Sequence, residues 1–390
     1  MNSVLLTSEY QKYTLNNRFG GGNYLTPSRE KEISKWVLEN PTHKQVEEIL
    51  SRSQDYEPLG PVDPWIIPDN YGATPEEKEE RAEKLYKFEH DAMVAVDLGL
   101  RYRLNLMGES ENKSDLSGAV VRILDAWSHI QEIDNTTGGS VLNWNEIWGV
   151  YIQAALLVRD SPEYTSDIDI NFKNATKRFL DKLSCAYTHF NNWASWGIST
   201  LIASAGLLED RKMFNSAVYR WRDQFNKSIV SNYEVNNGGV AQGQIKHNIP
   251  KYEIYRQGSI QGNGSSGLNY STHDLNGKVS AAEWARINGV WLYDHVSPDG
   301  SSLKGLYHNL ANWTYNGRGP DGIENREVLW FNTSEPPTGF TFTARPSWSN
   351  ILTQLWPDSN ADRVAAKRLG DDTQGQRATA LIYNGRPLMD

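Results

Sequence analysis

Apolar side chains recur at helical spacing through most of this chain, and this periodicity is the feature that most constrains its fold. The clearest helix face is formed by Ile147, Tyr151, Ala154, Ala155 and Val158. Spacings of three and four residues place such side chains on one side of an α-helix. The pattern also indicates helices at 30–52, 77–105, 118–131, 168–187, 190–208, 214–225, 278–288 and 303–311. We therefore predict an all-α fold.

Short links between the helices predict antiparallel helical hairpins. Only Glu209, Asp210 and Arg211 separate the helix ending at 208 from the next helix, and so short a link turns the chain back on itself. Repeated hairpins build either a solenoid or a closed α/α toroid, and the absence of a fixed sequence period favours the toroid. No linker interrupts the pattern, so residues 1–390 are predicted to form a single domain.

Two segments break the helical pattern. The segment 236–270 is rich in Gly, Asn, Gln and Ser, with scattered aromatic and basic residues. Long loops inside a compact domain are usually functional or disordered, and the aromatic and charged side chains favour a functional loop. The segment 316–346 mixes Gly and Pro with short apolar runs, and we expect short strands or an extended flap there.

Charge and hydropathy exclude several classes of function. The net charge of −9 argues against nucleic-acid binding, and no apolar run approaches the roughly 18 residues of a membrane helix. Cys185 is the single cysteine, so no intramolecular disulfide is expected. The first residues lack a basic start and a long apolar stretch, so the chain is either cytosolic or the mature form of a secreted or periplasmic protein.

Metal and nucleotide sites find no support in the sequence. The eight His are scattered, and neither a His-x-x-x-His pair nor a phosphate-binding Gly-rich loop is present. We therefore expect no metal and no cofactor. A glycoside hydrolase would need two opposed carboxylates, and no acidic pair is singled out by its surroundings, although this class of enzyme stays open as an alternative.

The aromatic content fits carbohydrate binding. Fourteen Trp and nineteen Tyr are many for 390 residues, and flat aromatic faces suit sugar rings. Trp144, Trp193 and Trp196 are candidates to stack on sugars, with core packing as the alternative for each. A non-catalytic glycan-binding protein therefore also stays open.

Two adjacent asparagines open an otherwise apolar helix in the run Asn191-Asn192-Trp193-Ala194-Ser195-Trp196. Asn has poor helix propensity, and a buried amide needs hydrogen-bond partners. Either the two residues cap a helix that begins near Trp193, or one amide side chain points into a cleft.

This run resembles the Asn-Asn-His-x-Tyr-Trp motif of family 5 within the alginate-lyase-like polysaccharide lyases, which are α/α toroids and include families 5 and 38. Residues 253–256 are similar to the Glu-Leu-x-Arg motif, and residues 268–270 to Leu-x-Tyr. Residues 281–293 resemble the signature Ala-Glu-x-Ala…Gly-Val-Asp-Leu-Tyr. The resemblance covers 185–313, and the longer loop before Tyr270 together with Trp193 in place of the motif His favours family 38.

The resemblance implies roles for individual residues. Tyr270 falls on the catalytic Tyr, Asn192 on the Asn that neutralises the substrate carboxylate, and Arg256 on the family's Arg. An indole cannot relay protons, so His247 is our candidate for the role of the missing His, with a plain surface His as the alternative. The residues expected to bind substrate are Asn191, Trp193, Trp196, Trp144, Lys251 and His273.

The implied reaction is β-elimination in a polyuronate. A base removes the proton at C5, beside the carboxylate, and the C4–O bond breaks. Donors facing the carboxylate stabilise the charge that develops, and in D-glucuronate and D-mannuronate one Tyr can serve as both base and acid because the C5 proton and O4 lie on the same side. We therefore expect a monomeric lyase whose partner is an acidic polysaccharide, either glucuronan or mannuronate-rich alginate.

Overall fold

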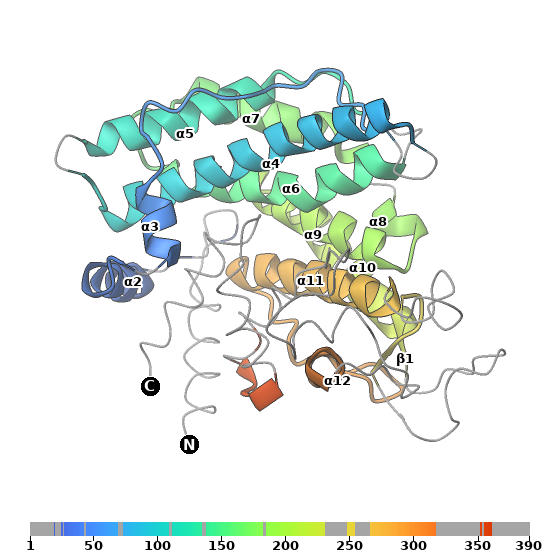
Figure 1. Cartoon of the computed structure of the whole chain (residues 1–390). Helices are drawn as coiled ribbons and strands as arrows, with labels where there is room; N and C mark the ends of the chain where they lie inside the picture. The colour runs from blue at the N-terminus through green and yellow to red at the C-terminus, as the bar shows by residue number, and fades with distance from the viewer. Residues whose placement is uncertain are drawn as a thin grey trace. The chain divides into compact units, whose positions relative to one another are not determined.

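The computed structural model describes residues 19, 25, 27–42, 44–68, 73–108, 111–134, 138–181, 185–230, 248–253, 266–316, 352 and 355–360. These residues are mainly helical (Figure 1), which confirms the predicted all-α class. They divide into two compact units. Unit 1 holds the described residues of 185–199 and 215–372, and unit 2 holds those of 17–184 and 200–214. The expected single domain stays a prediction.

Unit 2 is built from long helices that lie side by side. Its helices are α2 (Pro27–Glu39), α3 (Lys44–Leu50), α4 (Pro75–Leu104), α5 (Lys113–Ser128), α6 (Gly138–Val158) and α7 (Ser166–Arg178). Helix α4 packs against both α5 and α6, and α5 packs against α7 (Figure 1). Thr74 and Glu77 form a reciprocal capping box at the start of α4, which satisfies backbone donors that no helical carbonyl can reach.

An aromatic cluster forms the core of unit 2 and includes Trp144, contrary to its predicted role in sugar stacking. Trp144 is 2% exposed. Its ring stacks on Trp148 at a centroid distance of 4.4 Å and on Phe88 at 5.1 Å. A ring enclosed on both faces offers no surface to a sugar, so Trp144 contributes apolar burial instead.

Unit 1 contains the elements on both sides of the chain's double-asparagine run. Its elements are α8 (Cys185–Thr188), β1 (Ile229–Val230), β2 (Ile249–Pro250), α11 (Ser266–Ile287) and α12 (Leu303–Asn316). Helices α9 (Asn192–Leu207) and α10 (Arg211–Ser228) contribute residues to both units. Strands β1 and β2 pair in antiparallel fashion, with Ile229 opposite Pro250, and this pairing was not predicted.

Several helix bounds differ from the predicted ones. The expected helix 30–52 is two helices, because Pro41 cannot donate the next backbone hydrogen bond and the Asn40 side chain bonds to the carbonyl of Trp36. The helix expected from 168 ends at Arg178. The helix expected at 278–288 begins at Ser266 instead, so Tyr270 lies within α11 and not in a loop. The strands expected within 316–346 lie outside the described residues beyond Asn316.

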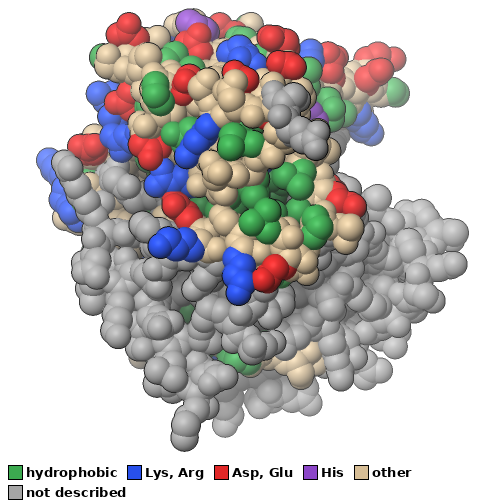
Figure 2. All heavy atoms as spheres, turned by 90° about the vertical axis from the view of Figure 1, so that its left-hand side faces the viewer, with side chains coloured by type: hydrophobic (Ala, Val, Ile, Leu, Met, Phe, Trp, Pro, Cys, Tyr) green, Lys and Arg blue, Asp and Glu red, His purple; other side chains and the backbone are tan. Residues whose placement is uncertain are grey.

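None of the described helices combines the length and the apolar character needed to cross a bilayer. On the face shown in Figure 2, acidic and basic side chains are interspersed around a group of hydrophobic ones. The charges visible on that face therefore carry both signs, so the net charge of −9 does not describe each part of the surface.

Candidate active site

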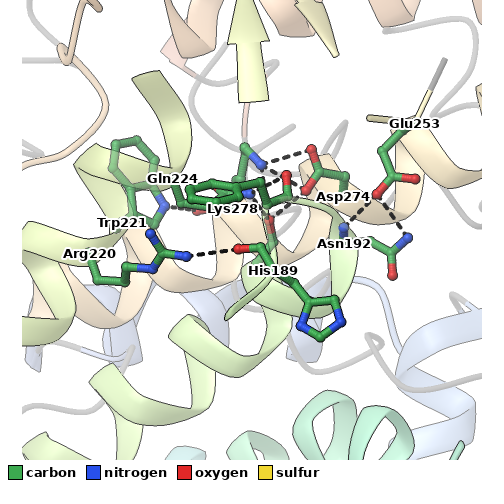
Figure 3. A network of polar contacts seen from close by, with 10 residues as sticks. His189, Asn192, Arg220, Trp221, Gln224, Glu253, Asp274 and Lys278 are labelled. Atoms are coloured by element: carbon green, nitrogen blue, oxygen red, sulfur yellow. Dashed lines mark hydrogen bonds and ion pairs between the residues drawn. The ribbon is translucent and has the colours of Figure 1, made fainter. Parts of the chain in front are cut away.

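The start of α9 is tied to the segment that carries Glu253. The carbonyl of Asn191 accepts hydrogen bonds from the backbone N–H groups of Ala194 at 3.0 Å and Ser195 at 3.2 Å, so the helix begins here. Asn192 is fully buried, and both its backbone N–H and its Nδ2 donate to Oε1 of Glu253, at 2.5 and 3.0 Å (Figure 3). A carboxylate at a helix N-terminus is favourable because it faces the positive end of the dipole.

Helix α11 lies beside α9 with the same direction of increasing residue number. The rings of Trp196 and His273 are in contact, with centroids 5.6 Å apart. One turn further along α9 and two turns further along α11, the hydroxyls of Ser199 and Ser280 are 2.8 Å apart. Tyr270 is half-buried and precedes His273 by one turn, so the register brings Tyr270 toward the level of the start of α9.

A buried polar cluster joins α9, α10 and α11 immediately beyond this point (Figure 3). Lys278 Nζ donates to both carboxylate oxygens of Asp274, at 2.7 and 2.8 Å, and to Ser195 Oγ at 3.0 Å. Gln224 donates to the same hydroxyl at 3.1 Å, and Trp221 Nε1 donates to the carbonyl of Lys278 at 3.2 Å. Burial lowers the pKa of the Lys278 ammonium, and the neighbouring carboxylate of Asp274 opposes this shift.

Trp193, which stands where the family motif has His, packs against another histidine. Trp193 is half-buried, and its ring stacks on the exposed ring of His189 with centroids 5.6 Å apart and planes 25° apart. Arg220 holds this segment by donating to the carbonyl of His189 at 2.8 Å (Figure 3). His189 was not among the predicted site residues, although it lies one helical turn before Trp193.

The segment before Arg256 adds aromatic and basic groups. Lys251 Nζ lies 5.3 Å from the centroid of the Tyr252 ring, and that ring stacks on Phe190 at 6.1 Å. Lys251 is partly exposed, as the predicted binding role requires. Arg256 and His247, two of the four predicted catalytic residues, lie outside the described residues.

The remaining predicted binding residues differ in their exposure. Asn191, Trp193 and His273 are partly exposed, whereas Trp196 is only 7% exposed and serves mainly as a packing surface for His273. Sequence reasoning missed the buried partners of the site, Glu253, Asp274 and Lys278. An available signal was the spacing of Asp274 and Lys278, because an acid four residues before a base on a helix favours an ion pair.

The chemistry available here is proton transfer beside a carboxylate. Within the described ranges, no group of three His, Cys, Asp or Glu side chains is arranged to hold a metal ion. The partly exposed groups are a phenol, two imidazoles and an ammonium, contributed by Tyr270, His189, His273 and Lys251. The nearby carboxylates of Glu253 and Asp274 are both buried and hydrogen-bonded to other parts of unit 1.

Comparisons with known proteins agree with one another. A family model described as alginate lyase matches residues 37–319. Alginate lyase A1-III from Sphingomonas species A1 superimposes with a TM-score of 0.62 at 15% sequence identity, over 94% of this chain and 97% of that one. A Tyr-to-Phe variant of alginate lyase A1-III complexed with a tetrasaccharide gives 0.60 at 14% identity, over 95% and 98%.

A third solved structure extends this likeness to another organism. An alginate lyase from Bacteroides ovatus superimposes with a TM-score of 0.56 at 14% identity, over 95% of this chain and 99% of that one. No curated relative matches the chain by sequence. At these identities the solved structures show a shared fold, which is the α/α toroid architecture.

Proposed function

The chain belongs to the alginate lyase family and is a polysaccharide lyase, and from this premise we propose that it cleaves glucuronan or mannuronate-rich alginate by β-elimination. Family membership rests on a match that spans residues 37–319, well over half of the 390-residue chain. The substrate and the roles of individual residues are our proposal.

The register of α9 and α11 is the observation that carries this proposal. The two helices meet where Ser195 donates to Asp274 at 2.5 Å. Asn192 precedes Ser195 by about one turn, and Tyr270 precedes Asp274 by about one turn, on helices that run in the same direction. A carboxylate-binding amide at the start of α9 and a proton-transferring phenol in the first turns of α11 suit a uronate placed between them.

In the proposed reaction the Tyr270 phenolate takes the proton from C5 of the uronate. The electron pair left behind forms the C4–C5 double bond as the C4–O bond breaks, and the same phenol returns the proton to the departing O4. Asn192 and Arg256 stabilise the second negative charge that develops on the carboxylate. Asn192 Nδ2 carries two hydrogens, and Glu253 accepts one of them, so one donor remains for the substrate.

The base also needs a lowered pKa, because an ordinary Tyr holds its proton at neutral pH. Nearby cations favour the phenolate, and we assign this task to Arg256. His247 supplies a second proton-transfer group where the C5 proton and O4 lie on opposite faces. Since the substrate is a polymer, we propose that the protein acts as a secreted or periplasmic monomer.

The test is the ultraviolet absorbance of the unsaturated uronate that β-elimination produces. The purified chain and its Tyr270→Phe variant are incubated separately with glucuronan, polymannuronate and polyguluronate. We expect absorbance to grow on glucuronan or polymannuronate, and to fall on the order of 1000-fold in the variant, since a positioned acid–base group contributes about 10²–10⁴-fold. New reducing ends without absorbance would assign hydrolysis instead. If neither new reducing ends nor absorbance appeared, a glycan-binding protein would be the remaining assignment.

A further inference from the structure

Gly277 lies in the interior of α11, where glycine is unfavourable for a helix. A Cβ atom at this position would lie 2.9 Å from Cβ of Ser195, 3.0 Å from its carbonyl carbon and 3.0 Å from the backbone nitrogen of Trp196. Real Cβ atoms essentially never come closer than 3.0 Å to such atoms, and contacts of 3.0–3.4 Å are tighter than nine in ten real Cβ contacts, so an added Cβ would force a shift here. The glycine is therefore explained by a close approach of α11 to the backbone of α9.

The polar cluster of Ser195, Asp274 and Lys278 links α9 and α11 at this same close approach. Ser195, Asp274 and Lys278 are each no more than 1% exposed, and three hydrogen bonds to two residues engage the Lys278 ammonium. A buried ion pair stabilises a fold little, because the desolvation of its two charges offsets their attraction. Directional bonds at a glycine contact instead restrict the crossing to one arrangement.

We propose that Ser195, Asp274, Gly277 and Lys278 form a positioning joint, which sets the separation of Asn192 and Tyr270 for proton transfer. This inference rests on the proposed function. None of the four residues is proposed to contact substrate, so they act through the helices that carry Asn192 and Tyr270.

The geometry explains why a small change at the joint reaches the reaction. Ser195 lies about one turn after Asn192 on α9, and Asp274 about one turn after Tyr270 on α11. Within one helical turn the backbone is stiff, so a shift of α11 against α9 moves Tyr270 by a similar amount. A misplacement of about 1 Å at a reacting group costs on the order of 100-fold in rate.

The first test compares Ser195→Ala with Ser199→Ala. Both substitutions delete a hydroxyl that links α9 to α11, and Ser199, whose Oγ lies 2.8 Å from that of Ser280, is one turn further from Asn192. We expect kcat to fall about 10-fold in Ser195→Ala with KM unchanged, and to stay at the wild-type value in Ser199→Ala. Thermal unfolding should change to a similar extent in both variants.

The second test is Gly277→Ala, which forces α11 away from the backbone of α9. We expect a loss in kcat on the order of 100-fold, with KM within about twofold and a folded far-ultraviolet circular dichroism spectrum. If Gly277→Ala does not fold, the comparison of Ser195→Ala with Ser199→Ala alone tests the positioning joint.

The outcomes separate the joint from the proposed function. An active wild type in which Ser195→Ala and Ser199→Ala keep equal kcat values would overturn the joint alone. A fall confined to KM would do the same, because it would show a role in binding and not in positioning. A wild type that releases no unsaturated product would overturn the proposed function, and the joint with it.

Discussion

Two buried carboxylates, Asp91 in unit 2 and Asp274 in unit 1, are compensated in opposite ways. In unit 2, Asp91 is fully buried, and its carboxylate accepts hydrogen bonds from the Tyr56 hydroxyl, Trp127 Nε1 and the backbone N–H groups of Leu59 and Gly60. All four donors are neutral. In unit 1, the buried carboxylate of Asp274 is bound instead by the ammonium of Lys278 and the hydroxyl of Ser195.

This difference separates two uses of a buried carboxylate. Asp91 attaches the segment that precedes α4 to α4 itself, next to aromatic packing, and so contributes mainly to stability. The carboxylate of Asp274 joins two helices whose other residues are proposed to carry the reaction. Other buried positions of α11 near Asp274 include the polar residues Ser271, Thr272 and Asn276 as well as the apolar Leu275 and Val279. Both carboxylates make directional contacts, but Asp91 holds a segment against an aromatic core, whereas Asp274 fixes one helix against another.

The largest effect expected on stability comes from Asp91→Ala in unit 2. The substitution strands four donors, including the buried indole N–H of Trp127, so the free energy of unfolding should fall by about 3–5 kcal/mol. Urea denaturation measures this change in the free energy of unfolding. Asp91→Asn is the matched control, because its amide oxygen still accepts, and it should cost less than Asp91→Ala. An equal loss in the two variants would show that the side chain's volume matters more than its hydrogen bonds.

The ion pair of unit 1 should behave differently under substitution. Lys278→Met leaves the Asp274 carboxylate buried without its cation and should cost about 3 kcal/mol. The double variant Asp274→Leu with Lys278→Met should recover most of this stability while its kcat remains low. Denaturation and initial rates on the same samples give both quantities. Recovery of kcat together with stability would remove the contrast between the two units.

The smallest effect concerns the pH dependence of unfolding through His295. Burial, and then the charge of Arg222, lower the pKa of His295 below its ordinary value of 6.5. As the pH falls below about 6.5, the unfolded chain therefore takes up the proton first, and stability declines until the folded pKa is passed. His295 is partly exposed, and solvent screening limits the effect to about 0.5 kcal/mol.

His295→Gln provides the measurement for this prediction. Its amide can still donate to Asn226 Oδ1, which lies 2.8 Å from His295 Nε2, but it does not titrate. The pH profile of unfolding between about 6.5 and 5 should be flatter in the variant than in the wild type. Parallel profiles would assign the acid sensitivity to other groups.

The amino-acid sequence by itself determined the helical class, the helix pairs and the family. Periodic apolar side chains at 147–158 and 214–225 lie on helices, as predicted, because a helix face is a local property of the sequence. The family motifs were also readable, since residues near one another in the chain carry them. Those motifs point to Asn192 and Tyr270, whose catalytic roles stay a prediction.

The contacts between distant parts of the chain are decided by the tertiary structure. The first turns of α11 contain Gly, Ser and Asn, which favour loops locally, so the start of this helix could not be read from propensity. Contacts between residues 61 to 83 positions apart, such as Glu253 with Asn192 and Lys278 with Ser195, leave no local signature. The same holds for Trp144, because whether an indole lines a cleft or a core depends on the packing around it. Local spacing specifies the helix faces, and only their packing decides which polar groups share an interior.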